Sequence, residues 1–97
     1  MAGMIELTLG DRIVVPEAVI SRELDGETVV LNLETGVYFG LDGVATDIWN
    51  ALQGAGRIED AFNSLLNQYE VQPATLKDDL LSFVNQLAAK GLLSAGS

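Results

Sequence analysis

The chain has 97 residues, which favours one small domain, and 48% of them are hydrophobic, which is enough for a packed core. It contains no Cys and no His, so disulfides, thiolate and imidazole catalysis and the common zinc sites are excluded. Five Lys and Arg against fourteen Asp and Glu give a net charge of −9, which disfavours nucleic acid and anionic membranes as partners.

Residues 1–18 are expected to form an N-terminal arm. They carry a weak alternation at Ile5, Leu7 and Leu9 and a short apolar run that Pro16 ends, so an extra strand is the alternative to an extended arm. The N-terminus has no basic region and no apolar run long enough for a signal peptide or a membrane span. We therefore expect a cytoplasmic protein.

Residues 19–41 are predicted to form a three-stranded antiparallel meander. Turn signals at Asp25-Gly26 and at Gly36 separate strands at about 19–24, 27–33 and 37–41. The last strand of a meander is an edge unless another segment covers it. The sheet therefore either only supports the helices or uses its exposed edge as a functional surface.

The alternation within these strands assigns their faces. In the middle strand one face carries Val29, Leu31 and Leu33, and the other carries Thr28, Val30 and Asn32. Side chains expected to anchor the sheet to the rest of the fold are Leu31, Leu33, Phe39 and Leu41.

Residues 42–93 are predicted to form a three-helix bundle, because the apolar period changes from two to about 3.6. Asp42 is a good N-cap for a helix at about 43–53, whereas Arg57 is a poor one for the helix at about 57–69. A third helix runs from Pro73 or Thr75 to about Lys90. The expected fold class is α+β, a winged helix-turn-helix arrangement with the three-stranded sheet placed first.

The third helix has an unusually wide apolar surface. Its core stripe consists of Leu76, Leu80, Phe83 and Leu87. Leu81, Val84 and Ala88 extend the apolar arc on one flank only. That flank either packs as ordinary core or lines a groove beside the edge strand.

No catalytic constellation is present. The neighbouring carboxylates Glu59-Asp60 and Asp78-Asp79 point about 100° apart on a helix and cannot share a site. We therefore expect no enzyme activity, no metal and no cofactor, and a binding module instead. Binding of DNA by the winged helix is an alternative that the charge disfavours. An edge strand beside an apolar flank suits capture of an extended peptide as an added strand.

Four segments in this order and spacing resemble the PqqD-like family. They are Leu31-Asn32-Leu33, Gly36-Val37-Tyr38-Phe39-Gly40-Leu41-Asp42, Ile48-Trp49 and Lys90-Gly91-Leu92-Leu93. The resemblance covers about residues 19–93. The family usually has Asn where Asp42 stands, and both residues are N-caps.

The resemblance implies a recognition element that binds the leader of a ribosomally made, post-translationally modified precursor peptide and presents it to a processing enzyme. The leader would add to the third strand and pack against the third helix. Carried over by position, this surface consists of Val37, Tyr38, Phe39, Gly40, Lys77, Asp78, Leu81 and Asn85.

Two pathways are compatible with this resemblance. The free-standing chain and its acidic character favour the leader-binding proteins of lasso peptide clusters, whose partners are a leader peptidase and a cyclising enzyme. The alternative is a peptide chaperone for a radical enzyme in quinone cofactor biosynthesis. We expect a monomer or a weak dimer. If the arm, at residues 5–15, covered the rim near Leu81, the peptide site would have to open or lie elsewhere.

Overall fold

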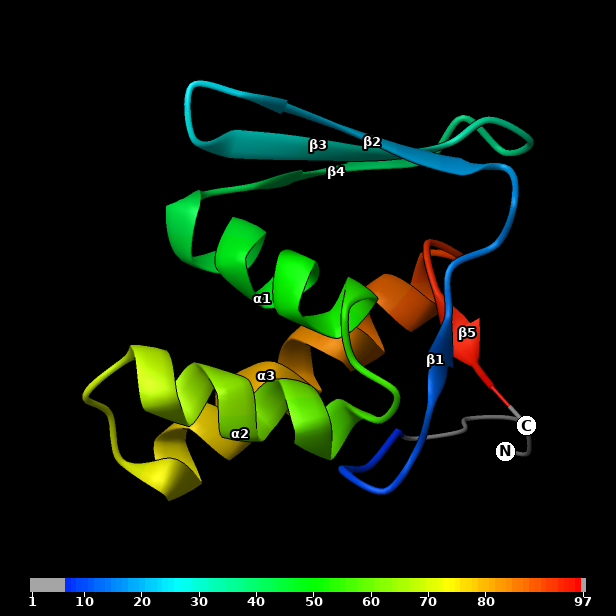
Figure 1. Cartoon of the computed structure of the whole chain (residues 1–97). Coiled ribbons are helices and arrows are strands. Elements are labelled where there is room, and N and C mark those ends of the chain that lie inside the picture. Colours follow the sequence, from blue (N-terminus) through cyan, green and yellow to red (C-terminus); the bar gives the residue numbers. More distant parts are fainter. Residues whose placement is uncertain (1–6, 97) are drawn as a thin grey trace.

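The computed structural model, which describes residues 7–96, is a sheet lying on three helices (Figure 1). The elements in chain order are β1 (Ile13–Val14), β2 (Val19–Leu24), β3 (Glu27–Asn32), β4 (Tyr38–Leu41), α1 (Gly43–Gln53), α2 (Ile58–Gln68), α3 (Pro73–Ala89) and β5 (Ser94–Ala95). This arrangement confirms the predicted α+β class, with a three-stranded antiparallel sheet followed by three helices. None of the helices in residues 7–96 is long and apolar enough to span a membrane.

The three-stranded sheet has the order β2-β3-β4, with both pairings antiparallel. The β2–β3 turn uses Asp25 at φ 56° and Gly26 at φ 81°, and two positive φ angles in a two-residue loop match the right-handed twist of the strands. In the described part of the chain β4 pairs with β3 alone, so β4 is an edge strand. The prediction of an edge at this strand is confirmed.

The expected inner face of β3 was wrong. The side chains of Thr28, Val30 and Asn32 are buried, whereas Leu33 is 60% exposed and Leu31 is half-buried. The polar residues can face inward because each has a partner: the Thr46 hydroxyl donates to the Thr28 hydroxyl at 3.0 Å, and Asn32 bonds to the backbone. Leu41 and Phe39, the other two expected anchors, do face the helices.

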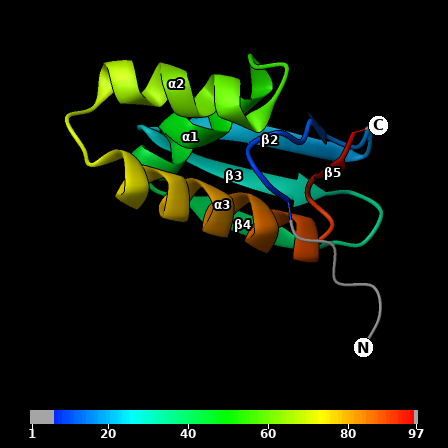
Figure 2. The same cartoon turned by 90° about the horizontal axis from the view of Figure 1, so that it is seen from below.

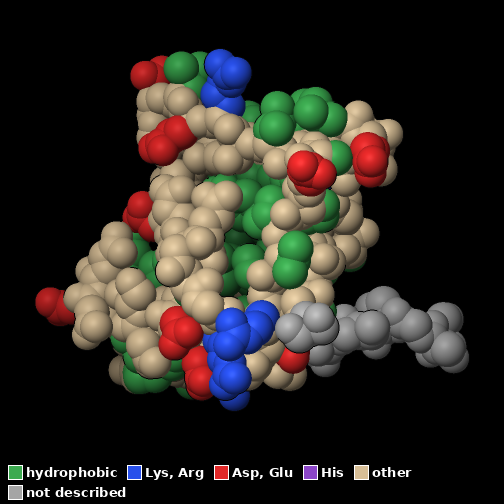
Figure 3. Space-filling view, turned by 45° about the vertical axis from the view of Figure 1, so that its right-hand side comes forward, with side chains coloured by type: hydrophobic (Ala, Val, Ile, Leu, Met, Phe, Trp, Pro, Cys, Tyr) green, Lys and Arg blue, Asp and Glu red, His purple; other side chains and the backbone are tan. Residues whose placement is uncertain are grey.

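As a result, the outer face of the sheet is apolar. Cross-strand register places Ile20, Leu31 and Tyr38 in one row, with Val29 in the next. Ile20 is 44% and Tyr38 is 68% exposed. Figure 3 shows hydrophobic side chains along the top of the molecule, over the sheet, and in the hollow between the sheet and the helices.

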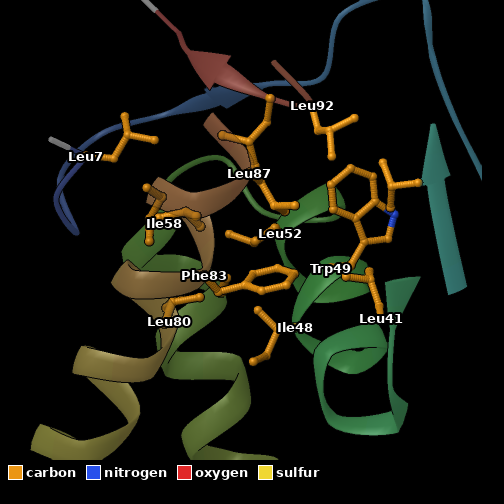
Figure 4. Close-up of a cluster of buried hydrophobic side chains, with 14 of the residues drawn as sticks. Leu7, Leu41, Ile48, Trp49, Leu52, Ile58, Leu80, Phe83, Leu87 and Leu92 are labelled. Atoms are coloured by element: carbon orange, nitrogen blue, oxygen red, sulfur yellow. The ribbon is translucent and has the colours of Figure 1, made fainter. Parts of the chain in front are cut away.

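The core lies between the sheet and the helices. Figure 4 shows Trp49 of α1 at one end of this cluster, next to the sheet, and Leu7 of the arm at the other. Trp49 and Leu7 are 1% and 2% exposed. The predicted stripe of α3 is buried, and so is Val84 from the flank.

The N-terminal arm supplies the hydrogen-bond acceptors that the start of α2 lacks, because Arg57 is a poor N-cap residue. The backbone N–H groups of Ile58 and Glu59 donate to the carbonyls of Asp11 at 2.9 Å and Leu9 at 2.8 Å. Free N–H groups at a helix start need such acceptors, so the arm substitutes for an N-cap side chain. The arm also pairs β1 with β5 near the C-terminus. Residues 1–6 of the predicted arm, including Ile5, lie outside the described residues.

A hydrogen bond joins α1 to the end of α2, where the Tyr69 hydroxyl donates to the Asp47 carboxylate. This bond, with a smaller effect of burial and of the negative charge on Asp47, raises the pKa of Tyr69 above its ordinary value. The stabilisation from a raised pKa is present below the ordinary value and is lost as pH rises past the folded value. It therefore operates throughout the neutral range.

The side chain of Asn32 ties the β3–β4 turn to the end of α3. Its Nδ2 donates to the Gly91 carbonyl at 3.0 Å, and its Oδ1 accepts from the N–H groups of Glu34 at 2.8 Å and Thr35 at 3.2 Å. Gly91 has φ 74°, as expected of a glycine just after a helix. Three backbone groups from two distant segments thus depend on one amide.

Replacing this amide tests the tie. Asn32→Ala should lower the free energy of unfolding by about 1–3 kcal/mol, because it removes the three hydrogen bonds made by this buried amide. The measurement is urea unfolding followed by far-UV circular dichroism. Asn63→Ala, at an exposed position of α2, is the matched control and should change stability by less than about 0.5 kcal/mol. Equal losses in both variants would show that the tie is unimportant.

Candidate functional site

The open edge of β4 presents a defined set of backbone groups. The N–H of Asn32 donates to the Val37 carbonyl at 2.9 Å, so the pair formed by these two residues is hydrogen-bonded. Bonded pairs alternate along an antiparallel ladder, and the next bonded pair is Val30 with Phe39. The N–H and C=O groups of Tyr38 and Gly40 therefore point away from β3, toward the open edge.

The side chains of β4 alternate about this edge. Val37 and Phe39 point to the helix side, where Phe39 is half-buried and Val37 is 37% exposed. Tyr38 and Gly40 belong to the outer face of the sheet. The structure thus brings Tyr38, Phe39 and Gly40 together on the accessible strand β4 (Figure 1), with Val37 directly before it.

The C-terminal end of α3 lies beside β4. The Lys90 Nζ stands over the Phe39 ring, 5.5 Å from its centroid. At 3.6 residues per turn, the side chains on the same flank of α3 as Lys90 are those of Asp79, Phe83 and Gln86. Figure 2 shows α3 and β4 on the same side of the molecule. This flank of α3 forms the helix side of the groove along β4.

The four predicted residues of α3 lie on other flanks of the helix than the one that leads to Lys90. Leu81 lies nine positions before Lys90, about two and a half helical turns, and so is on the opposite side of the helix. Three of the four, Asp78, Leu81 and Asn85, line a hollow of about 540 Å³ on the outer surface of α3, together with Gln86 from the flank of Lys90. Lys77, the fourth, is exposed and is not among the residues that line it.

The arm occupies part of that flank. The amide of Asn85 accepts a hydrogen bond from the N–H of Leu7 at 2.8 Å and donates one to the Leu7 carbonyl at 3.3 Å. Leu81 and Ala88 are half-buried against the core that Leu7 enters. Contact with the arm therefore explains the wide apolar flank. The flank packs as part of the core, as one of the two alternatives expected, but the sequence did not indicate that the arm would cover it.

Sequence reasoning missed the side chains that do reach β4, chiefly Lys90. The sequence did contain one signal for Lys90, the pair Lys90-Gly91 at the end of the helix. A glycine that ends a helix beside a sheet fixes the backbone position of the residue before it. No group of Asp and Glu in residues 7–96 could hold a metal ion. The exposed edge and the flank of α3 form a surface for contact with another chain.

Comparison with known proteins identifies the family. The sequence profile described as "Coenzyme PQQ synthesis protein D (PqqD)" matches residues 27–93. This chain belongs to the PqqD family. A search of curated proteins gave no match.

Two solved structures share the fold of this PqqD-family chain. TbiB1, solved in complex with the TbiA(beta) leader peptide, is 38% identical with a TM-score of 0.78, and the alignment covers 86% of this chain and 96% of TbiB1. A lasso peptide synthetase B1, solved with its leader peptide, is 23% identical with a TM-score of 0.74, and the alignment covers 86% of this chain and 98% of that one. The second likeness shows the fold alone.

The anchoring of the arm by Asn85 can be tested directly. Asn85→Ala should lower the free energy of unfolding by about 1–2 kcal/mol, because the buried Leu7 backbone loses both partners. Gln86→Ala, the exposed neighbour on α3, is the control and should change stability little. Hydrogen exchange of the Leu7 amide should be faster in Asn85→Ala alone. Unchanged exchange there would contradict the assignment.

Proposed function

We propose that this chain is a non-catalytic adaptor that binds the leader segment of a ribosomally made precursor peptide. The observation that carries the proposal is the open β4 edge, in a fold shared with two proteins solved with leader peptides. The precursor is of the lasso class, which the resemblance of this acidic chain to the leader-binding proteins of lasso peptide clusters supports. The adaptor acts as a single domain in the cytoplasm, where such precursors are made.

The edge supports this function through backbone geometry. A peptide that lies along β4 as a fourth strand bonds with the outward N–H and C=O groups of Tyr38 and Gly40. These bonds are independent of the peptide's sequence and provide affinity. Side chains on alternate residues of the peptide point either to the outer face or into the groove beside α3, where they provide specificity.

The composition of the chain fits an adaptor that leaves the chemistry to another protein. Without Cys or His, it has neither a thiolate nor an imidazole for peptide cleavage or ring closure. Holding the leader on this edge leaves the rest of the precursor free for a processing enzyme. We propose that the enzymes served are a leader peptidase and a cyclising enzyme.

A pair of proline substitutions tests the edge. Gly40→Pro removes an outward N–H while sparing the β3–β4 ladder, and proline is tolerated on such edges. It should weaken leader binding at least tenfold, about 1.4 kcal/mol. Ser21→Pro makes the same change on the opposite edge, because the Leu33-to-Ala18 bond directs the N–H of Ser21 away from β3.

Isothermal titration with the TbiA(beta) leader peptide measures both variants. Ser21→Pro should bind like the unmodified chain. Equal weakening in the two variants, or none in either, would remove β4 as the binding edge. Far-UV circular dichroism of each variant checks that the sheet is retained.

A second pair of substitutions tests which flank of α3 faces the peptide. Asp79→Trp fills the groove beside β4 and should weaken leader binding at least tenfold, because it occupies the space that peptide side chains need. Asp78→Trp lies in the outer hollow with Leu81 and Asn85 and should change affinity less than about twofold. Both positions are exposed. The reverse result would favour the surface of Lys77, Asp78, Leu81 and Asn85 expected from the sequence.

A further inference from the structure

The groove beside β4 carries a single positive charge in a chain whose net charge is −9. The flank of α3 that faces β4 presents Asp79, Phe83, Gln86 and Lys90, and only the last is a cation. We infer that Lys90 reads an acidic side chain of the bound peptide, at the peptide position that lies level with Phe39. This inference rests on the proposed function and names the chemistry of the segment that binds.

Lys90 is held in place by the residues that follow it. Its backbone N–H bonds to the Gln86 and Leu87 carbonyls at 3.2 Å, which closes the last turn of α3. The Gly91 carbonyl accepts from Asn32, and Leu92 is fully buried. The backbone of Lys90 is thus fixed on both sides, and its exposed side chain extends over Phe39.

Strand register then selects one peptide position. Because Phe39 directs its own N–H and C=O to β3, a residue opposite Phe39 in a peptide that adds antiparallel to β4 forms a non-hydrogen-bonded pair with it. In such pairs the side chains stand about 4.5–5.5 Å apart on the same face of the sheet. The side chain of this residue therefore lies beside the Phe39 ring, within reach of the Lys90 ammonium. A Glu or Asp at this peptide position forms an ion pair with the Lys90 ammonium beside the Phe39 ring.

The charges of the chain favour an acidic side chain of the peptide only at the position opposite Phe39. Elsewhere along the groove a carboxylate meets a negative field, which Asp79 strengthens on the same flank. A cation over a ring that is only half-buried, as Phe39 is, is held weakly, so Lys90 remains available to a carboxylate. The peptide class is therefore an extended segment that carries a carboxylate opposite Phe39 and apolar or neutral groups in its other groove positions.

The experiment scans a leader peptide that the chain binds, with Glu and then Gln placed at each position in turn. Affinities are measured for the unmodified chain, Lys90→Gln and Lys77→Gln. The last is a matched control, since it makes the same change of charge on the same helix at an exposed site away from β4. Exposed substitutions of this kind leave stability nearly unchanged.

At one position Glu should bind about threefold to fivefold tighter than Gln. This preference should persist in Lys77→Gln, disappear in Lys90→Gln and shrink with added salt. A Glu preference that Lys90→Gln retains, or no Glu preference at any position, would overturn the inference while leaving leader binding intact. If no leader bound the unmodified chain, both the proposed function and this inference would fail.

Discussion

The position of β4 relative to α3 depends on the amide of Asn32. The sheet and the last helix are far apart in sequence, and this one side chain joins the β3–β4 turn to the residue that ends α3. The same contact sets where Lys90 stands over Phe39. A polar residue is buried at this point because its three hydrogen bonds replace those lost from water. The hydrogen bonds of Asn32 therefore add to apolar packing in holding the sheet against the end of α3.

The arm performs a second joining function on the far side of the helices. It accepts hydrogen bonds from the start of α2, places Leu7 in the core and engages Asn85. Through β1 and β5 it also holds the C-terminal segment. The helix bundle is thus closed by the N-terminal segment on the side away from β4, and the β4 edge stays open.

The sequence predicts the elements of this fold well and the partners of its polar residues poorly. Helix and strand positions follow from apolar period, turn glycines and the Asp42 cap, which the structure confirms with a 2.9 Å bond to Ala45. The inner face of β3 could not be chosen by hydrophobicity, because Thr28 and Asn32 are buried with partners from distant segments. The edge itself was predictable. The helix flank beside the edge could not be predicted. An apolar helix flank has the same sequence pattern whether it packs against an N-terminal arm or lines a groove.

The apolar outer face of the sheet has a consequence for handling the protein. Rows of exposed Ile20, Val29 and Tyr38 side chains would favour colloidal association, and mutual repulsion between molecules of charge −9 opposes it. Near the isoelectric point of about 4.1 that repulsion vanishes while the apolar surface remains. Buffers near pH 4 are therefore where we expect precipitation to begin.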